Sequence, residues 1–375
     1  MLNYVINKNI LFRGVFYMKV VVFAISKNES KFVKRWYDSM KEADEIYVLD
    51  TGSADNTVEL LRENGVNVSS CEIKPWRFDN ARNISLEFVP MDTDICVCTD
   101  LDEVFLPGWR SELEKIWKDG INRVRYVYNW KLDDNDKPII SFYGEKIHSR
   151  LGYKWVNPVH EILKFDNINE NIVLTDNIVI NHYPDSNKSR GSYLPLLELS
   201  IQEDPLNDRN MHYLGREYMY YSRWNDCIDT LIKHLKLPNA TWKDERCASM
   251  RFIARSYMNL FRYDEARMWL NKAIKEAPYL REGYVEMAFL EHKMGNDFEV
   301  ISNCLKALQI KENKRSYINE SFCWDNTIDD LLSISYFNLG LYDVSLFYID
   351  KALEYDNNNE RLIKNREIIY RKGKE

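Results

Sequence analysis

The spacing of hydrophobic and polar positions changes character near residue 185. Between residues 19 and about 130, short β-branched and apolar runs alternate with amphipathic stretches of helical period. This alternation predicts βαβ units and a largely parallel sheet that helices cover on both faces. The expected strands are 20–24, 46–49, 66–68 and 95–99, and the expected helices are 32–40, 58–61 and 81–88.

Less regular strands complete the first domain. Residues 124–130 and 139–143 flank the polar turn LDDNDKP and predict a hairpin added to the sheet. Further strands are expected at 172–174 and 178–181. Met18 directly precedes the first strand, so residues 1–17 are interpreted as an extension. We then expect an α/β domain over 18–185, a linker helix over 186–206 and a helical domain over 207–375.

The helical domain contains a repeat. Small residues at Ala254, Ala266 and Ala273 precede Pro278, and the step from Ala254 to Ala288 is 34 residues. This spacing resembles the tetratricopeptide pattern, in which helix pairs stack because no pair buries its apolar face alone. An irregular helical bundle is the alternative. The matching positions elsewhere are Gly215, Tyr218, Cys227, Val300, Ala307, Ser333, Tyr336, Ser345 and Ala352.

Composition and charge narrow the class of partner. A chain of 375 residues favours two domains, and a net charge of −7 argues against binding nucleic acid or an anionic membrane. Seven cysteines without a CxxC pair indicate a reducing compartment, with Cys96 and Cys98 in the core. Arg13 and Lys19 interrupt the N-terminal apolar run, so we expect no integral membrane segment and a cytoplasmic protein.

An acidic cluster follows the strand 95–99. Ligands of open α/β sheets bind beyond the carboxyl ends of the strands, and Asp100, Asp102 and Glu103 lie there. Clustered carboxylates raise one another's pKa unless a cation neutralises them, and oxygen ligands select Mg²⁺ or Mn²⁺. Such an ion completes its shell with substrate phosphates, which predicts a metal–diphosphate site. The similar Asp92–Asp94 and Asp134–Asp136 pairs are interpreted as solvated turns.

The loops after the first two strands are also polar. They read SKNES (residues 26–30) and DTGSADNT (residues 50–57). Asp50 ends a strand, Gly52 permits a tight turn, and Ser53 or Asp55 can cap the next helix. A carboxylate such as Asp50 can accept a hydrogen bond from a nucleotide base or a ribose hydroxyl. Neither glycine-rich phosphate-binding motif, G-x-G-x-x-G or G-x-x-x-x-G-K-[ST], occurs in the chain.

Four motifs together resemble family 2 glycosyltransferases, which have the Rossmann-like GT-A fold. In chain order they are AISKNES, LDTGSADNT, FDNARN and TDLDEV, and the resemblance covers about residues 19–185. One departure is Thr51, which stands where the family often has a second aspartate. The tetratricopeptide-like array and the VHE sequence at residues 159–161 are similar to a subset that modifies peptides or proteins.

The resemblance implies a role for each matching residue. Asp102 would bind the metal ion, Mn²⁺ or Mg²⁺. His182, by its position after a later strand, could complete the metal shell or contact phosphate. Glu161 would act as the general base beside His160. For Lys27 a solvated loop charge, and for both histidines a hydrogen bond within their loops, are the alternatives. The residues expected at the nucleotide sugar are Ser26, Lys27, Glu29, Asp50, Gly52, Arg82, Asn83, Asp100 and Leu101.

The expected function is metal-dependent, inverting transfer of a hexose or N-acetylhexosamine. The donor would be a nucleoside diphosphate sugar, with a UDP-sugar favoured, and the acceptor a peptide, a protein or a glycan. The repeats are expected to dock the acceptor or to form a homodimer, with anchors at Tyr218, Tyr220, Tyr221 and Trp224 unless these rings form inter-repeat core. The alternatives are a sugar nucleotidyltransferase, whose G-x-G-T-R loop is missing, and a repeat scaffold with an inactive transferase domain.

Overall fold

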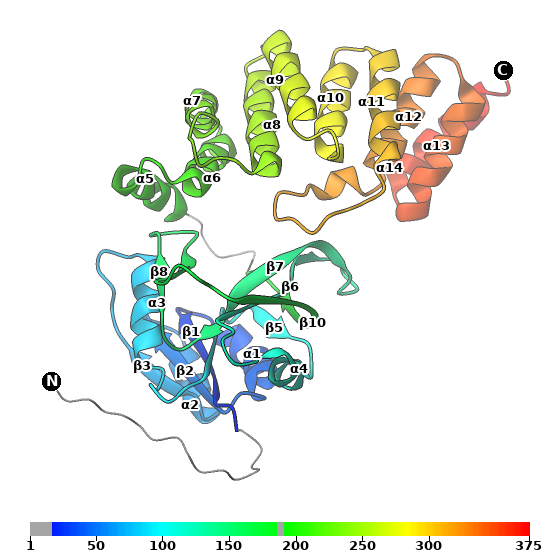
Figure 1. Cartoon of the computed structure of the whole chain (residues 1–375). Helices are drawn as coiled ribbons and strands as arrows, with labels where there is room; N and C mark the ends of the chain where they lie inside the picture. Colours follow the sequence, from blue (N-terminus) through cyan, green and yellow to red (C-terminus); the bar gives the residue numbers. More distant parts are fainter. Residues whose placement is uncertain (1–16, 186–190) are drawn as a thin grey trace.

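The structure, a computed structural model, describes residues 17–185 and 191–375. A domain built on a β-sheet is followed by an array of helices that lies along one end of it (Figure 1). The expected extension over residues 1–17 lies outside the described residues except for Tyr17, and so do residues 186–190 of the expected linker helix. Within the described ranges, no helix has the length and apolar content needed to cross a membrane.

The sheet of the first domain has eight strands in the order β3-β2-β1-β4-β7-β6-β10-β5. The strands β3, β2, β1 and β4 pair in parallel, which confirms the prediction for this half of the sheet. The strand β7 runs antiparallel to β4 and β6, so the other half is mixed. The bounds are β1 Val20–Ser26, β2 Glu45–Asp50, β3 Asn67–Ser70, β4 Ile95–Thr99, β5 Glu103–Phe105, β6 Arg123–Leu132, β7 Pro138–Ser149 and β10 Ile172–His182.

Helices cover both faces of the sheet, as alternation along β1 requires. Val20 and Val22 belong to the core cluster under α1, while Val21 and Phe23 belong to the cluster under α3. Cys96 and Cys98 lie in the second cluster, where burial raises the pKa of each thiol to about 12. The two cysteines therefore pack in the core as expected. The helices are α1 Ser30–Met40, α2 Thr57–Glu63, α3 Phe78–Glu87 and α4 Trp109–Ile116.

Three features of this domain differ from the prediction. The two strands expected at 172–174 and 178–181 form the single strand β10, whose pairing register with β6 shifts between Leu174 and Val179. The short strand β5 and the helix α4 were not predicted. A second sheet, made of β8 (Tyr153–Val156) and β9 (Ile162–Phe165), was also not predicted, because four-residue strands carry too little periodicity.

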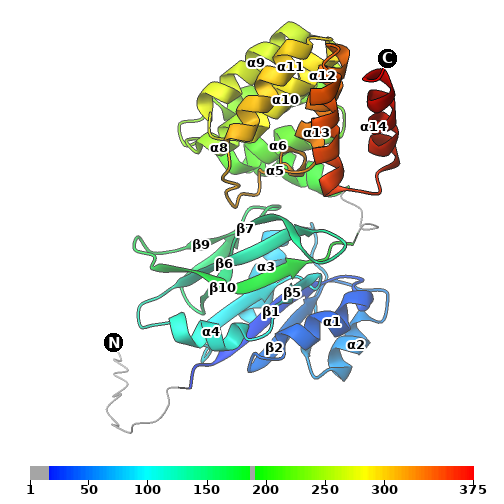
Figure 2. The same ribbon diagram turned by 90° about the vertical axis from the view of Figure 1, so that its right-hand side faces the viewer.

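The second domain consists of stacked helix pairs, which confirms the tetratricopeptide pattern (Figures 1 and 2). Ala254, Ala266 and Ala273 are fully buried where helices cross. At Gly215 an added Cβ would lie 2.3 Å from a methyl carbon of Leu231, so the two helices touch there. The helices are α5 Tyr193–Glu203, α6 Asp208–Tyr220, α7 Trp224–His234, α8 Lys243–Asn259, α9 Tyr263–Glu276, α10 Arg281–Lys293, α11 Asp297–Gln309, α12 Thr327–Asn338, α13 Tyr342–Tyr355 and α14 Glu360–Lys372.

The four aromatic residues expected as anchors divide into two groups. Tyr218 is only 9% exposed and its hydroxyl donates to Glu198, and Trp224 packs against the same core cluster. The alternative expected for these rings, inter-repeat core, therefore holds for Tyr218. Tyr220 and Tyr221 are exposed.

The connection between α11 and α12 folds back over the inner face of the array. It lies between the helices and the β6–β7 hairpin (Figure 1). The buried Arg251 of α8 donates to the carbonyl of Ile318, and the neighbouring Arg255 donates to Glu320 at 2.6 Å. Ile318 itself packs into the core cluster of the first repeats. The chain thus covers the inner face of α8 with its own residues.

Candidate active site

The carboxyl ends of β1 and β2 form one edge of the sheet, and the Asp50 carboxylate closes the turn there. Asp50 accepts from the backbone N–H groups of Gly52 and Ser53, both at 3.0 Å, and from the hydroxyls of Ser53 and Ser26. Gly52 has φ of +105°, a conformation that favours glycine. Because a carboxylate has about four acceptor sites, the turn occupies the Asp50 side chain.

The loop after β1 is tied to the same turn. The Asn28 N–H donates to the Ser53 hydroxyl at 2.8 Å, and the Asn28 side-chain oxygen accepts from the Ala54 N–H at 2.7 Å. This places the exposed Lys27 and the buried Glu29 on either side of Asn28. The two polar loops therefore form one rigid unit at the strand ends.

The first carboxylate after β4 is neutralised by the protein itself. Asp100 accepts from Arg82 at 2.7 Å and from the ammonium of Lys146 at 2.8 Å. Burial raises the pKa of Asp100, but Arg82 and Lys146 have the larger combined effect, so the pKa lies below its usual value. Arg82 is only 4% exposed. Asp100 is therefore ionised and fixed without a metal ion.

Glu103 is the second carboxylate that the protein neutralises. It is buried and accepts from the Lys146 ammonium, the Tyr128 hydroxyl and the Asp100 N–H, all within 3.0 Å. Burial raises the pKa of Glu103, and Lys146 opposes this shift. Arg82 and Lys146 therefore neutralise two of the three carboxylates, a pairing that was not predicted from the sequence, and metal binding at the cluster stays a prediction.

Asp102 faces a histidine instead. One of its oxygens lies 3.4 Å from Nε2 of His182, whose Nδ1 lies 3.1 Å from the carbonyl oxygen of Trp130. Burial lowers the pKa of His182, but the contact with Asp102 outweighs burial and the pKa lies above its usual value. With a proton on Nδ1 directed at the carbonyl, Nε2 donates to Asp102 when the ring is charged and offers a lone pair to a metal ion when the ring is neutral.

These two side chains suit a shared divalent ion. Neighbouring ligands of an octahedral ion bound at about 2.1 Å lie about 3 Å apart, close to the observed Asp102–His182 separation. In residues 17–185 and 191–375, no group of three or more such side chains is gathered for a metal. An ion here would draw its other ligands from water and phosphates, as Mg²⁺ commonly does.

Glu161 joins the Asp100 site through Arg82. The Arg82 Nε donates to Glu161 at 2.5 Å while another nitrogen of the same guanidinium donates to Asp100. The guanidinium carbon lies 5.1 Å from the ring of Trp155, a cation–π contact that further fixes its plane. The structure thus brings Glu161, Arg82 and Asp100 together.

His160 turns away from this chain of contacts. Its ring stacks on Tyr213 of α6, with centroids 3.9 Å apart and an angle of 19° between the planes. Its φ of +49° is in the left-handed region, where non-glycine residues are uncommon. The loop between β8 and β9 therefore directs Glu161 toward the sheet and His160 toward the helices.

Two of the predicted nucleotide-site residues have structural side chains. Asn83 donates to the carbonyl of Trp155 and accepts from its N–H, so it fastens β8 to α3. The Leu101 side chain is fully buried in the core, which leaves its backbone as the part available to a ligand. The missed residue Lys146 follows Glu145 in β7, so no sequence signal distinguishes it from an ordinary charged strand residue.

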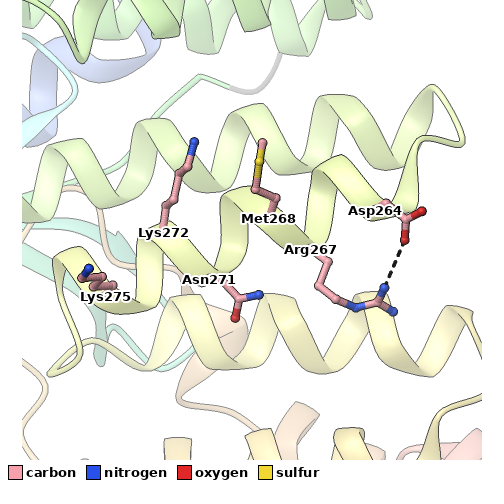
Figure 3. Close-up of a pocket in the computed structure, with 6 residues that line it drawn as sticks. All are labelled: Asp264, Arg267, Met268, Asn271, Lys272 and Lys275. Carbon is pink, nitrogen blue, oxygen red and sulfur yellow. Dashed lines mark hydrogen bonds and ion pairs between the residues drawn. The ribbon is translucent and has the colours of Figure 1, made fainter.

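A pocket elsewhere in the molecule is separate from this edge of the sheet. It lies on α9 and is lined by Asp264, Arg267, Met268, Asn271, Lys272 and Lys275 (Figure 3). Arg267 is paired with Asp264 at 3.4 Å and with Glu291 at 2.6 Å, so its charge is already balanced. The pocket contains none of the residues at the strand ends.

Solved structures that resemble part of the chain include MamA and tetratricopeptide-repeat proteins. MamA is 19% identical, with a TM-score of 0.37 over 48% of this chain and 99% of that chain. A thermophilic TPR protein from Thermus thermophilus is 16% identical, with a TM-score of 0.36 over 48% and 90%. YrrB, a TPR protein with an unusual peptide-binding site, is 13% identical, with a TM-score of 0.38 over 48% and 84%. The chain has no significant match among curated proteins.

Family models match both parts of the chain. Residues 21–173 match the glycosyl transferase family 2 model, which ends within β10, the strand that carries His182. Residues 252–279 match a tetratricopeptide-repeat model, over the helix pair α8–α9. The chain therefore joins a family 2 glycosyltransferase domain of GT-A fold to an array of tetratricopeptide repeats.

Proposed function

We propose that the protein transfers a hexose or an N-acetylhexosamine from a nucleoside diphosphate sugar, with UDP favoured, to an acceptor hydroxyl with inversion. The strongest support is one arrangement at the strand ends. The Asp102–His182 pair and the Glu161–Arg82–Asp100 chain of contacts lie at the same edge of one sheet. The first suits a metal-bound diphosphate, and the second offers a fixed carboxylate for the acceptor.

The metal ion in this proposal is Mn²⁺ or Mg²⁺, held by Asp102 and His182. The ion would offset the negative charge that develops on the departing diphosphate. The nucleotide would lie against Asp50, Gly52 and the loop with Lys27, whose rigid ties favour binding without rearrangement. The remaining proposed donor contacts are Ser26, Glu29, Arg82, Asn83, Asp100 and Leu101.

Glu161 is the proposed general base. Arg82 bonds to its Oε1, and no described residue bonds to Oε2, which is the oxygen proposed to take the proton. The acceptor oxygen forms a bond to the anomeric carbon as the bond from that carbon to the diphosphate breaks, and Glu161 takes the hydroxyl proton. One direct displacement inverts the anomeric configuration. His160 is proposed to position Glu161 through its stack on Tyr213.

A donor screen tests the proposal. Nucleoside diphosphate sugars are tested by thermal shift with Mn²⁺ and again with chelator, since a donor at 100 times its Kd stabilises a protein by about 2.7 kcal/mol. The best donor is then incubated with acceptors, and released nucleoside diphosphate is measured. A nucleotidyltransferase would instead convert the nucleoside diphosphate sugar and added pyrophosphate into a nucleoside triphosphate and a sugar 1-phosphate. Donor binding without turnover would support the repeat scaffold with an inactive domain.

A further inference from the structure

Six ring side chains form a continuous path from the metal-binding pair to the proposed base. In order they are His182, Trp130, Phe142, Tyr317, Tyr213 and His160, which we call the aromatic rim. Their successive centroid separations are 4.4, 6.5, 6.2, 6.0 and 3.9 Å. The first three rings come from the sheet, and the next two from the α11–α12 connection and α6. Both domains therefore contribute to this surface.

The aromatic rim contains a large ring that is open to solvent. Trp130 is 47% exposed although its ring stacks on His182, with an angle of 15° between the planes. Tyr317 is held rigidly, because its hydroxyl donates to the buried Glu245 and Trp242 packs against it edge-on. A rigid, exposed indole beside a group-transfer site offers a flat apolar face, which suits the apolar face of a sugar ring.

Two arginines lie on the same rings, and no described carboxylate is within ion-pair distance of either. The Arg209 guanidinium carbon is 5.2 Å from the ring of Tyr213 and 5.1 Å from that of Tyr317, and the Arg216 carbon is 4.5 Å from Tyr213. Neither arginine forms an ion pair with a described residue, and the Nε atoms of both are buried without a hydrogen-bond partner there. Burial lowers the pKa of Arg209, but the nearby Tyr213 and Tyr317 rings and the more distant Glu245 and Glu145 carboxylates outweigh burial and raise it, so Arg209 is charged without a direct partner.

Arg223, in the same helix pair, also contacts a tyrosine ring but has carboxylate partners. Its guanidinium carbon lies 4.3 Å from the ring of Tyr218. It also pairs with Asp226 at 2.7 Å and with Glu198 at 3.4 Å. Contact with a tyrosine ring therefore does not require an unpaired guanidinium, and Arg209 and Arg216 are available to an external anion.

The inner face of the repeats offers no open path for an extended peptide beside the rim. Ile318 and Glu320 lie against Arg251 and Arg255, where a peptide bound along α8 would have to lie. Displacing this segment would leave Arg251, which is fully buried, without its contact to Ile318. These contacts favour a compact acceptor placed at the rim.

We propose that the acceptor is a carbohydrate that carries a carboxylate or a phosphate, bound at the aromatic rim. Its sugar ring packs on Trp130, and its anionic group pairs with Arg209 and Arg216. Charge-assisted bonds from a guanidinium to a carboxylate or phosphate are bidentate and strong, and they would orient the acceptor hydroxyl toward Glu161. This inference rests on the proposed glycosyl transfer for its final step.

The first experiment compares acceptors with matched rings. Methyl glucuronide, glucose 6-phosphate and methyl glucoside are offered with the donor found in the screen, and kcat/KM is measured for each. We expect at least one anionic acceptor to exceed the neutral glucoside by 10-fold or more. The carboxylate and phosphate arms identify which anion the site accepts. Equal use of all three acceptors, or preference for the neutral glucoside, would overturn the inference.

Variants test whether Arg209 causes the preference for an anionic acceptor. Arg209→Met should lower kcat/KM for the preferred anionic acceptor by at least 10-fold and change the neutral one by less than threefold. Arg209→Lys, which keeps the charge, should restore part of the loss. Arg223→Met is the matched control and should leave the ratio unchanged. An unchanged preference in Arg209→Met, with a normal melting temperature, would refute the site.

A binding measurement separates this inference from the proposed function. Calorimetry with methyl glucuronide and with glucose 6-phosphate, on the full chain without donor, should detect one of them and lose it in Arg209→Met. Anion binding without any donor turnover would contradict glycosyl transfer and leave the binding site standing. Donor turnover with a neutral acceptor, together with no anion binding, would support glycosyl transfer and contradict the anion-binding site.

Discussion

The Glu161 carboxylate accepts a hydrogen bond from Nε of Arg82 at 2.5 Å, across 79 positions of sequence. The same guanidinium bonds to Asp100, so one buried arginine sets the distance between the proposed base and the acidic cluster after β4. A base that is fixed relative to the donor site is what direct displacement requires, because the reacting atoms have to approach in line.

The first prediction follows from this arrangement. Glu161→Gln keeps the shape and a hydrogen-bond acceptor for Arg82 but removes the group that takes the proton. We expect transfer to fall by roughly 100-fold or more, in line with general-base contributions of about 10²–10⁴. Donor affinity should stay within about threefold of wild type, measured by titration. Near-normal transfer, or a product that retains the anomeric configuration of the donor, would exclude Glu161 as the inverting base.

The second prediction concerns Asp102. Asp102→Ala removes one of the two proposed metal ligands and should lower donor turnover by roughly 100- to 1000-fold, equivalent to about 3–4 kcal/mol of lost charge stabilisation. Wild-type enzyme in excess chelator should lose activity to a similar extent. Asp136→Ala and Asp94→Ala are matched aspartate controls, exposed and outside the site, and should change little. Full activity with chelator present would refute metal dependence.

The parts of the fold in which buried residues recur at a regular spacing were predictable from the sequence. The strands β1, β2 and β4 and the small residues of the repeats follow from spacing alone, because burial on a fixed face imposes that spacing. The pattern also predicted that Asp102 follows a buried strand, and in the structure it follows β4. No spacing predicts that Arg82 lies between Glu161 and Asp100, because that contact depends on the turn of the β8–β9 loop.

The charge balance of the acidic cluster was not predicted from the sequence, for a related reason. From sequence, three neighbouring carboxylates require an external cation. The structure supplies Lys146 from β7, which lies next to β4 although 46 residues separate Lys146 from Asp100. Long-range pairing of this kind is fixed by sheet order, which a single sequence leaves open. The remaining carboxylate, Asp102, is still the predicted metal ligand.

The third prediction tests that charge balance. Lys146→Met removes the ammonium that Glu103 and Asp100 share and leaves a carboxylate that is 1% exposed without its cation. Breaking a buried ion pair costs about 3–5 kcal/mol, and we expect the free energy of unfolding in urea to fall by about 3 kcal/mol. Lys115→Met, which breaks an exposed pair with Glu112, is the control and should cost less than about 0.5 kcal/mol. Equal losses in the two variants would contradict the proposed balance.

The fourth prediction is a loss of stability in mild acid. Burial lowers the pKa of His148 and of His212 to about 3 each. The unfolded chain binds these protons near pH 6.5 and the folded chain does not, so stability is complete above pH 6.5 and falls as the pH drops toward 3. Each histidine should cost about 2 kcal/mol between pH 7 and pH 5 in urea unfolding.

A variant tests whether His212 contributes to this loss of stability in acid. His212→Asn keeps a hydrogen-bonding group for Ser249 but has no titrating ring, so it should remove about half of the pH dependence. His292→Asn changes an exposed histidine and should leave the dependence intact. If the stability of the wild-type protein is the same at pH 7 and pH 5, these histidines are not buried as neutral rings.

The last prediction concerns the contact through which α6 holds the base loop. Besides the stack of Tyr213 on His160, Asn207 bonds to Asn157, and Asn210 donates to the carbonyl of Val159. Three residues spaced three positions apart at the start of α6 thus contact and fix the loop that ends in Glu161. A misplacement of about 1 Å at a reacting group can cost about 100-fold in rate.

Tyr213→Leu removes the ring and should lower kcat by roughly 10- to 100-fold while the KM for the donor changes less than twofold. Tyr213→Phe keeps the stack and should retain most of the activity. A purely structural role would instead lower the fraction of folded enzyme, so that activity per folded molecule and the KM for donor stay unchanged in both variants. Measuring kcat against the concentration of folded protein, determined by circular dichroism, separates the two. Wild-type kcat per folded molecule in Tyr213→Leu would show that the helices do not position the base.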